Sequence, residues 1–293
     1  MLTEKQKQQF EKEGYLLVRN VLTAEQVRWL RAFFRPKLDA PHFLGDTDRC
    51  LMDLFGRYPQ VRWLCFHELT LRILRALFGQ DIVLLPEVSI HLNYFGKWHR
   101  DTTNCAYSGL TFFTEKDYLM WTVAYYLQEN TVEYGGGLDV EPGSHRRPED
   151  PFANRTGYRE RSILERIWHQ INRPARRQYW LAREEYDNNG YIPTNVVSIP
   201  SRPGDLIVFD HRLTHHATPA RGFATQDGWL ARGVLPAEHE KLGIFCTWSR
   251  NNAMARRYFD WCKTKDCYPH LKDFSYPADF LKEAEKAGVN LIY

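Results

Sequence analysis

The chain has 293 residues, of which 43% are hydrophobic and 14% aromatic, and its 39 basic and 36 acidic residues leave a formal net charge of +3. This composition excludes a disordered or low-complexity chain and supplies enough apolar material for a sizeable core. No apolar run approaches the ~20 residues of a membrane helix, and the N-terminus is charged where a secretory signal is apolar. We therefore expect a cytoplasmic protein without a membrane partner.

The first eighty residues predict helices and one short strand. Residues 3–12 carry charges at helical spacing, Gly14 ends that run, and YLLV then predicts a strand. The pattern AEQVRWLRAFF after Thr23 predicts a second helix with one apolar side, which suits packing against a sheet. A third helix is expected over residues 68–78.

From residue 82 the chain changes to short runs rich in β-branched and aromatic residues, separated by turn signals: IVLLPEVSIHLNYF, MWTVAYYLQ, GLDVEP, NVVSIP, GDLIVF and LGIFCTW. Regular helices do not alternate with these runs, which argues against a doubly wound parallel sheet and favours a β sandwich or barrel. Asp139 and Glu141 alternate with Leu138 and Val140, so we expect both carboxylates to face out of the barrel. Helices are expected again in NNAMARRYFDWC and ADFLKEAEKAG.

A long polar block, at about residues 144–189, separates two of the predicted strands and includes the helical stretch RSILERIWHQI. Loops of this length inside a compact domain are usually lids or insertions. Between Arg146 and Arg183 the block has ten arginines, no lysine and four acidic residues. It predicts either the solvated face of a surface helix or an electropositive wall beside an anionic substrate.

Two segments gather the residue types that bind a metal ion. His99 and Asp101 directly follow the strand that ends in NYF, and positions i and i+2 of an extended segment point the same way. The segment GDLIVFDHRLTHHATP supplies His211, His215 and His216. Two imidazoles and one carboxylate, with open positions opposite, form the facial triad of non-haem Fe(II) oxygenases. The residues thus indicate an iron site and leave open which later histidine completes it.

These segments resemble the phytanoyl-CoA dioxygenase-like branch of the Fe(II)/2-oxoglutarate-dependent dioxygenases. The resemblance spans nearly the whole chain and includes FEKEGYLLVRNVLTAEQVRWLR, WHRD, WTVAYYLQENTVEYGGGLDVEPGSH, and GDLIVFDHRLTHHATP followed by KLGIFCTW. It implies a mainly β fold, the double-stranded β-helix or cupin-like jelly roll with flanking helices, in a single domain over residues 1–293. It also implies Fe(II), 2-oxoglutarate as co-substrate, and O2.

The resemblance implies three iron ligands. His99 and Asp101 match the family's HxD pair, and the third ligand of its GDxxxFxxxxxH pattern falls on His215. His216 is the alternative, because HAT would then stand where the family has HGS. Halogenating relatives replace the carboxylate with a small residue, so Asp101 implies hydroxylation or another oxidation.

The resemblance also implies residues that bind 2-oxoglutarate. The family normally has an arginine at the start of the strand after the distal histidine, but Lys241 falls there in this chain. Lys241 is expected to be either this functional cation or an ordinary solvated residue at a strand end. A lysine neutralises a carboxylate without the two-pronged grip of arginine. Arg232 and Arg221 are the alternatives. Thr218 is expected to donate to the same carboxylate, and Trp121 to flank the co-substrate or to pack in the core.

The expected function is therefore an Fe(II)- and 2-oxoglutarate-dependent dioxygenase. It would hydroxylate or otherwise oxidise an unactivated C–H bond of a small polar or anionic molecule and release succinate and CO2. The alternative is a non-catalytic jelly-roll ligand-binding protein with a vestigial metal site, which the weak match at Lys241 supports. A nucleic-acid partner is not expected, because the overall charge is nearly even.

Overall fold

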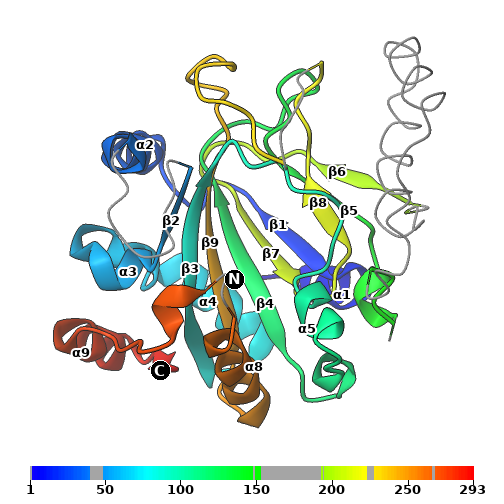
Figure 1. Cartoon of the computed structure of the whole chain (residues 1–293), viewed down its shortest axis with the longest axis vertical. Coiled ribbons are helices and arrows are strands. Elements are labelled where there is room, and N and C mark those ends of the chain that lie inside the picture. The colour runs from blue at the N-terminus through cyan, green and yellow to red at the C-terminus, as the bar shows by residue number, and fades with distance from the viewer. Residues whose placement is uncertain are drawn as a thin grey trace.

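The computed structural model describes residues 2–39, 49–147, 149–152, 193, 195–222, 228–265 and 268–293. Its strands form a larger and a smaller sheet. Figure 1 shows the smaller sheet on one side of the larger one and α2, α3 and α9 on the other. This arrangement agrees with the predicted mainly β fold with flanking helices.

The N-terminal predictions are confirmed. Helix α1 (Glu4–Glu13) begins with a capping box in which the Thr3 and Gln6 side chains each accept from the other's backbone N–H. It ends at Gly14, whose φ of 83° is left-handed. Strand β1 (Tyr15–Val18) follows. The other helices of the described residues are α2 (Ala24–Asp39), α3 (Leu54–Arg57), η1 (Pro59–Leu64), α4 (Glu68–Phe78), α5 (Thr103–Tyr107), η2 (Phe112–Thr114), η3 (Ser144–Arg146), α8 (Ala253–Lys263), η4 (Pro269–Leu271) and α9 (Ala278–Ala287).

The larger sheet has seven strands in the order β1-β7-β4-β9-β3-β10, with β2 also paired to β3. All of its pairs are antiparallel except β10 with β3. Its remaining strands are β2 (Cys50–Met52), β3 (Ile82–Leu92), β4 (Met120–Tyr126), β7 (Leu206–Asp210), β9 (Leu242–Arg250) and β10 (Asn290–Leu291). The strand predictions are confirmed, while the short edge strands β2 and β10 were not foreseen.

Alternation along the central strands gives the larger sheet two different faces. In β4, Trp121, Val123 and Tyr125 pack into a core with apolar residues of α2, α4 and α9. The intervening Ala124 and Tyr126 pack instead with the smaller sheet. Because both faces are covered, every residue of β4 is buried.

The smaller sheet consists of β6 (Val197–Ile199), β5 (Leu138–Val140) and β8 (His215–Ala217), all antiparallel. An isolated β-bridge between His99 and His215 joins it to the segment that follows β3. The two sheets are thus connected at the two histidines that the sequence marks as candidate ligands.

Most of the polar block at 144–189 lies outside the described residues, including all of RSILERIWHQI, so its role as a lid stays a prediction. Among the residues that the structure describes, none of the helices has the length and apolar character of a membrane span.

Candidate metal centre

Backbone pairing brings His99 and His215 together. The His99 N–H donates to the His215 carbonyl at 3.0 Å, and the His215 N–H donates to the His99 carbonyl at 2.9 Å. Two residues further on, the Asp101 N–H donates to the His211 carbonyl at 2.9 Å. The HxD segment is therefore held beside β8 by its own backbone, whatever its side chains bind.

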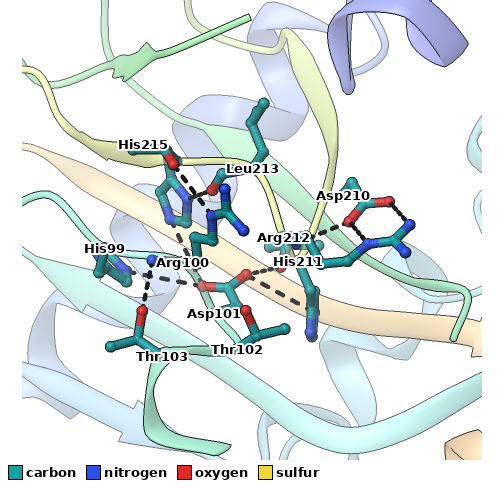
Figure 2. A network of polar contacts seen from close by, with 12 residues as sticks. His99, Arg100, Asp101, Thr102, Thr103, Asp210, His211, Arg212, Leu213 and His215 are labelled. Atoms are coloured by element: carbon teal, nitrogen blue, oxygen red, sulfur yellow. Dashed lines mark hydrogen bonds and ion pairs between the residues drawn. The ribbon is translucent and has the colours of Figure 1, made fainter. Parts of the chain in front are cut away.

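The side chains of His99, Asp101 and His215 converge (Figure 2). One potential ligand atom from each lies within 4.8 Å of the other two. The Asp101 Oδ1 is 3.6 Å from the His215 Nε2 and 3.8 Å from the His99 Nε2. Two imidazole nitrogens and a carboxylate oxygen at these separations fit one divalent metal ion, the donor set of a non-haem Fe(II) site.

Hydrogen bonds aim the lone pairs of both histidines into this cluster. The His99 Nδ1 lies 2.6 Å from the Lys97 carbonyl, and the His215 Nδ1 lies 2.9 Å from the Leu213 carbonyl. A carbonyl oxygen only accepts, so each Nδ1 carries a proton and each Nε2 presents a lone pair. Such carbonyl contacts orient metal-binding histidines and select their tautomer.

The electrostatics favour the protonation states that metal binding needs. Burial opposes ionisation of Asp101, but the imidazoles of His215, His211 and His99 and a hydrogen bond from Thr122 lower the pKa of its carboxyl. The Thr122 Oγ1 donates to the Asp101 Oδ2 at 2.7 Å, which leaves Oδ1 toward the histidines. Burial, with the nearby His99, lowers the pKa of His215 to about 3, so its imidazole is neutral at physiological pH.

His216, the alternative ligand, is not part of this cluster. It follows His215 in β8 and therefore points to the opposite face. There its Nε2 lies 3.0 Å from the Asp139 Oδ2, and its ring stacks on Trp98. The structure thus brings His215, and not His216, to the other two predicted ligands.

The carboxylates expected to face out of the barrel are not solvated. Asp139 and Glu141 are only 3% and 1% exposed. Asp139 is held by His216 and by the Thr218 hydroxyl, which donates to its Oδ1 at 2.6 Å. Glu141 accepts from the Arg147 guanidinium at 2.5 Å. Buried carboxylates need such partners, and those of Asp139 lie far away in the sequence, where local alternation does not reveal them.

His211, the remaining histidine of the segment GDLIVFDHRLTHHATP, also lies beside Asp101. Its Nε2 is 3.8 Å from the Asp101 Oδ2, the oxygen that faces away from His99 and His215 (Figure 2). The side chain is 1% exposed, and this Nε2 has no hydrogen-bond partner among the described residues. His211 therefore flanks the cluster without joining its ligand set.

The cluster opens on a cavity of about 290 Å³, small for a ligand pocket. The sheet residues that line it include His91 from β3, Tyr126 from β4, and Phe245 and Thr247 from β9. Lys241, directly before β9, also lines it. The cavity thus lies between the two sheets, with the predicted metal ligands and the predicted co-substrate lysine in one space.

Lys241 is not a solvated strand end. Its side chain is 2% exposed, and its Nζ donates to the Tyr94 carbonyl at 2.5 Å. Within the described residues no carboxylate pairs with this ammonium. Burial lowers the pKa of Lys241 to about 7, against the attraction of Asp139. A buried ammonium without a counter-ion is costly, and an anion in the cavity would offset that cost.

Tyr126 is a further polar group of the cavity that the sequence analysis missed. Its hydroxyl is buried and has no hydrogen-bond partner among the described residues. Burial, with Asp139 and Asp101 nearby, raises the pKa of Tyr126, so it stays a neutral donor. The sequence could have indicated this position. Alternation along MWTVAYY puts Tyr126 on the same face of the strand as Thr122, whose hydroxyl contacts Asp101.

Four other predicted co-substrate residues lie outside the cavity lining. Trp121 faces the helices and stacks on Phe78, so the core-packing alternative holds for it. The Thr218 hydroxyl donates its hydrogen bond to Asp139. Arg232 forms an ion pair with Asp39, and Arg221 is exposed. Strand alternation and the paths of the loops place these four side chains outside the lining, and short sequence motifs do not encode either feature.

Comparisons with known proteins agree with this geometry. The family model of phytanoyl-CoA dioxygenase matches residues 10–225. No curated protein matches the sequence. Similar solved structures include the non-haem α-ketoglutarate-dependent epimerase SnoN from nogalamycin biosynthesis, at 18% identity and a TM-score of 0.54, covering 84% of this chain and 82% of that one.

Two further similar structures are EctD from S. alaskensis and EvdO2 from Micromonospora carbonacea var. aurantiaca. Each is 19% identical with a TM-score of 0.53 and covers 85% of this chain. The match covers 77% of the EctD chain and 92% of the EvdO2 chain. The predicted jelly-roll fold with flanking helices is confirmed.

Proposed function

Because the chain belongs to the phytanoyl-CoA dioxygenase family, whose members depend on Fe(II) and 2-oxoglutarate, we propose that it oxidises an unactivated C–H bond of a small polar molecule. The observation that carries this proposal is the convergence of His99, Asp101 and His215 on a cavity that also contains the buried cation Lys241. A metal-binding donor set and a separate anion site in one cavity are what this chemistry requires.

His99, Asp101 and His215 would hold the iron, since both histidines present Nε2 and the aspartate presents Oδ1. When bound, iron and 2-oxoglutarate supply the oxidising chemistry, in which O2 is consumed, succinate and CO2 are released, and a substrate C–H bond is oxidised. The Thr122 hydroxyl keeps the Asp101 carboxylate in one orientation. The chain thereby fixes its ligands before the metal arrives.

Lys241 and Tyr126 would hold the distal carboxylate of 2-oxoglutarate. Lys241 supplies the positive charge in place of the usual arginine, and Tyr126 supplies a hydroxyl that has no other partner among the described residues. His91 lines the same cavity, and its pKa is lowered to about 3 by burial and by Lys241, so it adds no second charge. A carboxylate would thus find one ammonium and one hydroxyl donor, both of them buried.

The outcome of the oxidation stays open within this proposal. Structures of the same fold include an epimerase, SnoN, and a carbocyclase, SnoK, besides a complex of EctD with 5-hydroxyectoine. Asp101 supports hydroxylation or another oxidation over halogenation. The expected anionic character of the substrate rests on arginines that lie mostly outside the described residues and stays a prediction.

An anaerobic visible difference spectrum tests the proposal. Adding Fe(II) and then 2-oxoglutarate to the full chain should produce a broad charge-transfer band, which Asp101→Ala should weaken and the exposed control Asp117→Ala should leave unchanged. Succinate release with a substrate panel then follows. No band in a fully iron-loaded wild type would contradict the proposal and favour the non-catalytic ligand-binding protein.

A further inference from the structure

Glu87 lies at an irregularity in β3 and lines the cavity. Between two paired positions, residues 85–87 of β3 lie opposite the single Thr247 of β9. Pro86, at the centre of this insertion, has no N–H to donate to the ladder. Such interruptions redirect side chains and are common beside active sites. The regular pairing of β3 with β9 is thus interrupted at the residue whose carboxylate lines the cavity.

Three hydroxyls hold the Glu87 carboxylate in place. The Tyr268 hydroxyl donates to Oε1 at 2.5 Å, and the Tyr258 hydroxyl and the Thr247 Oγ1 each donate to Oε2 at 2.9 Å. They come from β9, from α8 and from the segment after α8, so three separate elements support one side chain. Tyr258, Tyr268 and Thr247 also line the cavity. This is a supported polar subsite, distinct from the three metal ligands.

The other charged groups of the cavity wall have partners or assigned ligands. Asp101 faces the metal position and Lys241 the co-substrate, whereas the Arg100 guanidinium donates to the carbonyls of Ser144 and Arg147. Glu87 forms no ion pair with any lysine or arginine of the described residues. A carboxylate in a cavity is strongly stabilised by a cation, and none of these described residues supplies one.

We propose that Glu87 is the substrate-recognition residue and that it binds a protonated amine of the substrate. This inference rests on the proposed function, because it assigns to the substrate the carboxylate of the described lining that neither the metal nor 2-oxoglutarate uses. Tyr258, Tyr268 and Thr247 are positioning residues that orient the carboxylate. An ammonium held at Glu87 would place the amine-bearing molecule in the cavity that the metal ligands share.

The test uses three probes with the same ring and different charge: cyclohexylammonium, cyclohexanol and cyclohexanecarboxylate. Their dissociation constants are measured by ligand-observed NMR with the full chain, both metal-free and loaded with Zn(II) and 2-oxoglutarate to prevent turnover. We expect the wild type to bind the ammonium at least about tenfold more tightly than the alcohol, as a charged hydrogen bond implies. Glu87→Gln should abolish that preference. The exposed control Glu115→Gln should retain it.

Tyr268→Phe provides a second, milder variant, because it removes one donor and leaves the carboxylate. It should reduce the ammonium preference only in part, and melting curves establish that each variant is folded. The proposal is overturned if the ammonium binds no better than the alcohol, if no probe binds, or if a folded Glu87→Gln protein keeps the preference.

The two proposals fail in different ways. An ammonium preference in the metal-free chain, with no charge-transfer band after iron and 2-oxoglutarate, would contradict the oxygenase assignment and support the Glu87 site. A normal band without an ammonium preference would overturn the Glu87 site alone. Glu87→Gln should itself keep the band, because Glu87 is neither a metal ligand nor a partner of Lys241.

Discussion

The metal centre and the Lys241 end of the cavity differ in how their polar groups are satisfied. At the metal centre, His99 and His215 each use Nδ1 on a backbone carbonyl, and Asp101 accepts from Thr122. At the other end, the Lys241 ammonium has a single carbonyl partner. The polar groups of one half hold one another in place, whereas the other half leaves a buried ammonium without a counter-ion among the described residues.

The two halves of the site should therefore respond differently to substitution. A pre-organised ligand set fails when one of its members is removed, because no other side chain replaces it. At an incomplete site, a substitution leaves the fold intact. It changes instead the affinity for the ligand and the pH dependence of binding.

His215→Gln should abolish stoichiometric iron binding, because it removes one of three ligands from a cluster without a substitute. Altering only the supports of such ligands costs about 10- to 100-fold in metal affinity, so removal of a ligand should cost more. Metal content after dialysis, measured by elemental analysis, checks this. Full retention of iron would show that His211, beside Asp101, can take over as a ligand.

Lys241→Met should weaken 2-oxoglutarate binding by about 10- to 100-fold, since it removes a charged hydrogen bond from a buried site. Iron binding should be unchanged, because Lys241 does not touch the ligands. The charge-transfer titration measures both. Lys241→Arg is the matched control and should bind the co-substrate at least as well as wild type; equal affinity in all three proteins would remove Lys241 from the site.

His216→Ala should keep iron and lose stability. It removes a hydrogen-bond partner of the buried Asp139 carboxylate, and leaving a buried polar group without its partner costs about 1–3 kcal/mol. A lower midpoint in urea, with normal metal content, is the expected result. Loss of iron from a protein that remains folded would reopen the choice between His215 and His216.

The affinity for 2-oxoglutarate should fall as the pH rises above 7. Lys241 has its pKa lowered from 10.5 to about 7, so above pH 7 the free site is mostly neutral and must take up a proton when the anion binds. The affinity should then drop by up to about tenfold per pH unit, as proton linkage requires. Lys241→Arg should flatten the profile between pH 7 and 9; parallel profiles in the two proteins would contradict this assignment.

Tyr126→Phe should have the smallest effect. It removes a buried hydroxyl that lacks a partner among the described residues, so stability should stay the same or rise slightly. Affinity for 2-oxoglutarate should fall by about three- to tenfold, the value of one hydrogen bond. Thermal melting and the same spectroscopic titration check the two expectations separately, and unchanged affinity would limit the anion site to Lys241.

Local sequence patterns predicted the longer helices, the main strands and the candidate ligands, but not the short helices α3 and α5. Helical charge spacing and Gly14 delimited α1, and β-branched runs delimited β3, β4, β7 and β9, because caps and periodicity act within a few residues. The HxD pair needed only an extended backbone to bring His99 and Asp101 to one side. The resemblance to a family then supplied the spacing to His215.

Tertiary structure alone decided which side chains enter the cavity. Shifting a strand by one residue exchanges its faces, so the choice between His215 and His216, or between Trp121 and Thr122, depends on pairing with distant segments. The burial of Lys241 and the pairing of Asp139 likewise depend on partners far away in the chain. Sequence periodicity determines that neighbouring residues point apart, and only non-local backbone pairing determines which of them faces the metal.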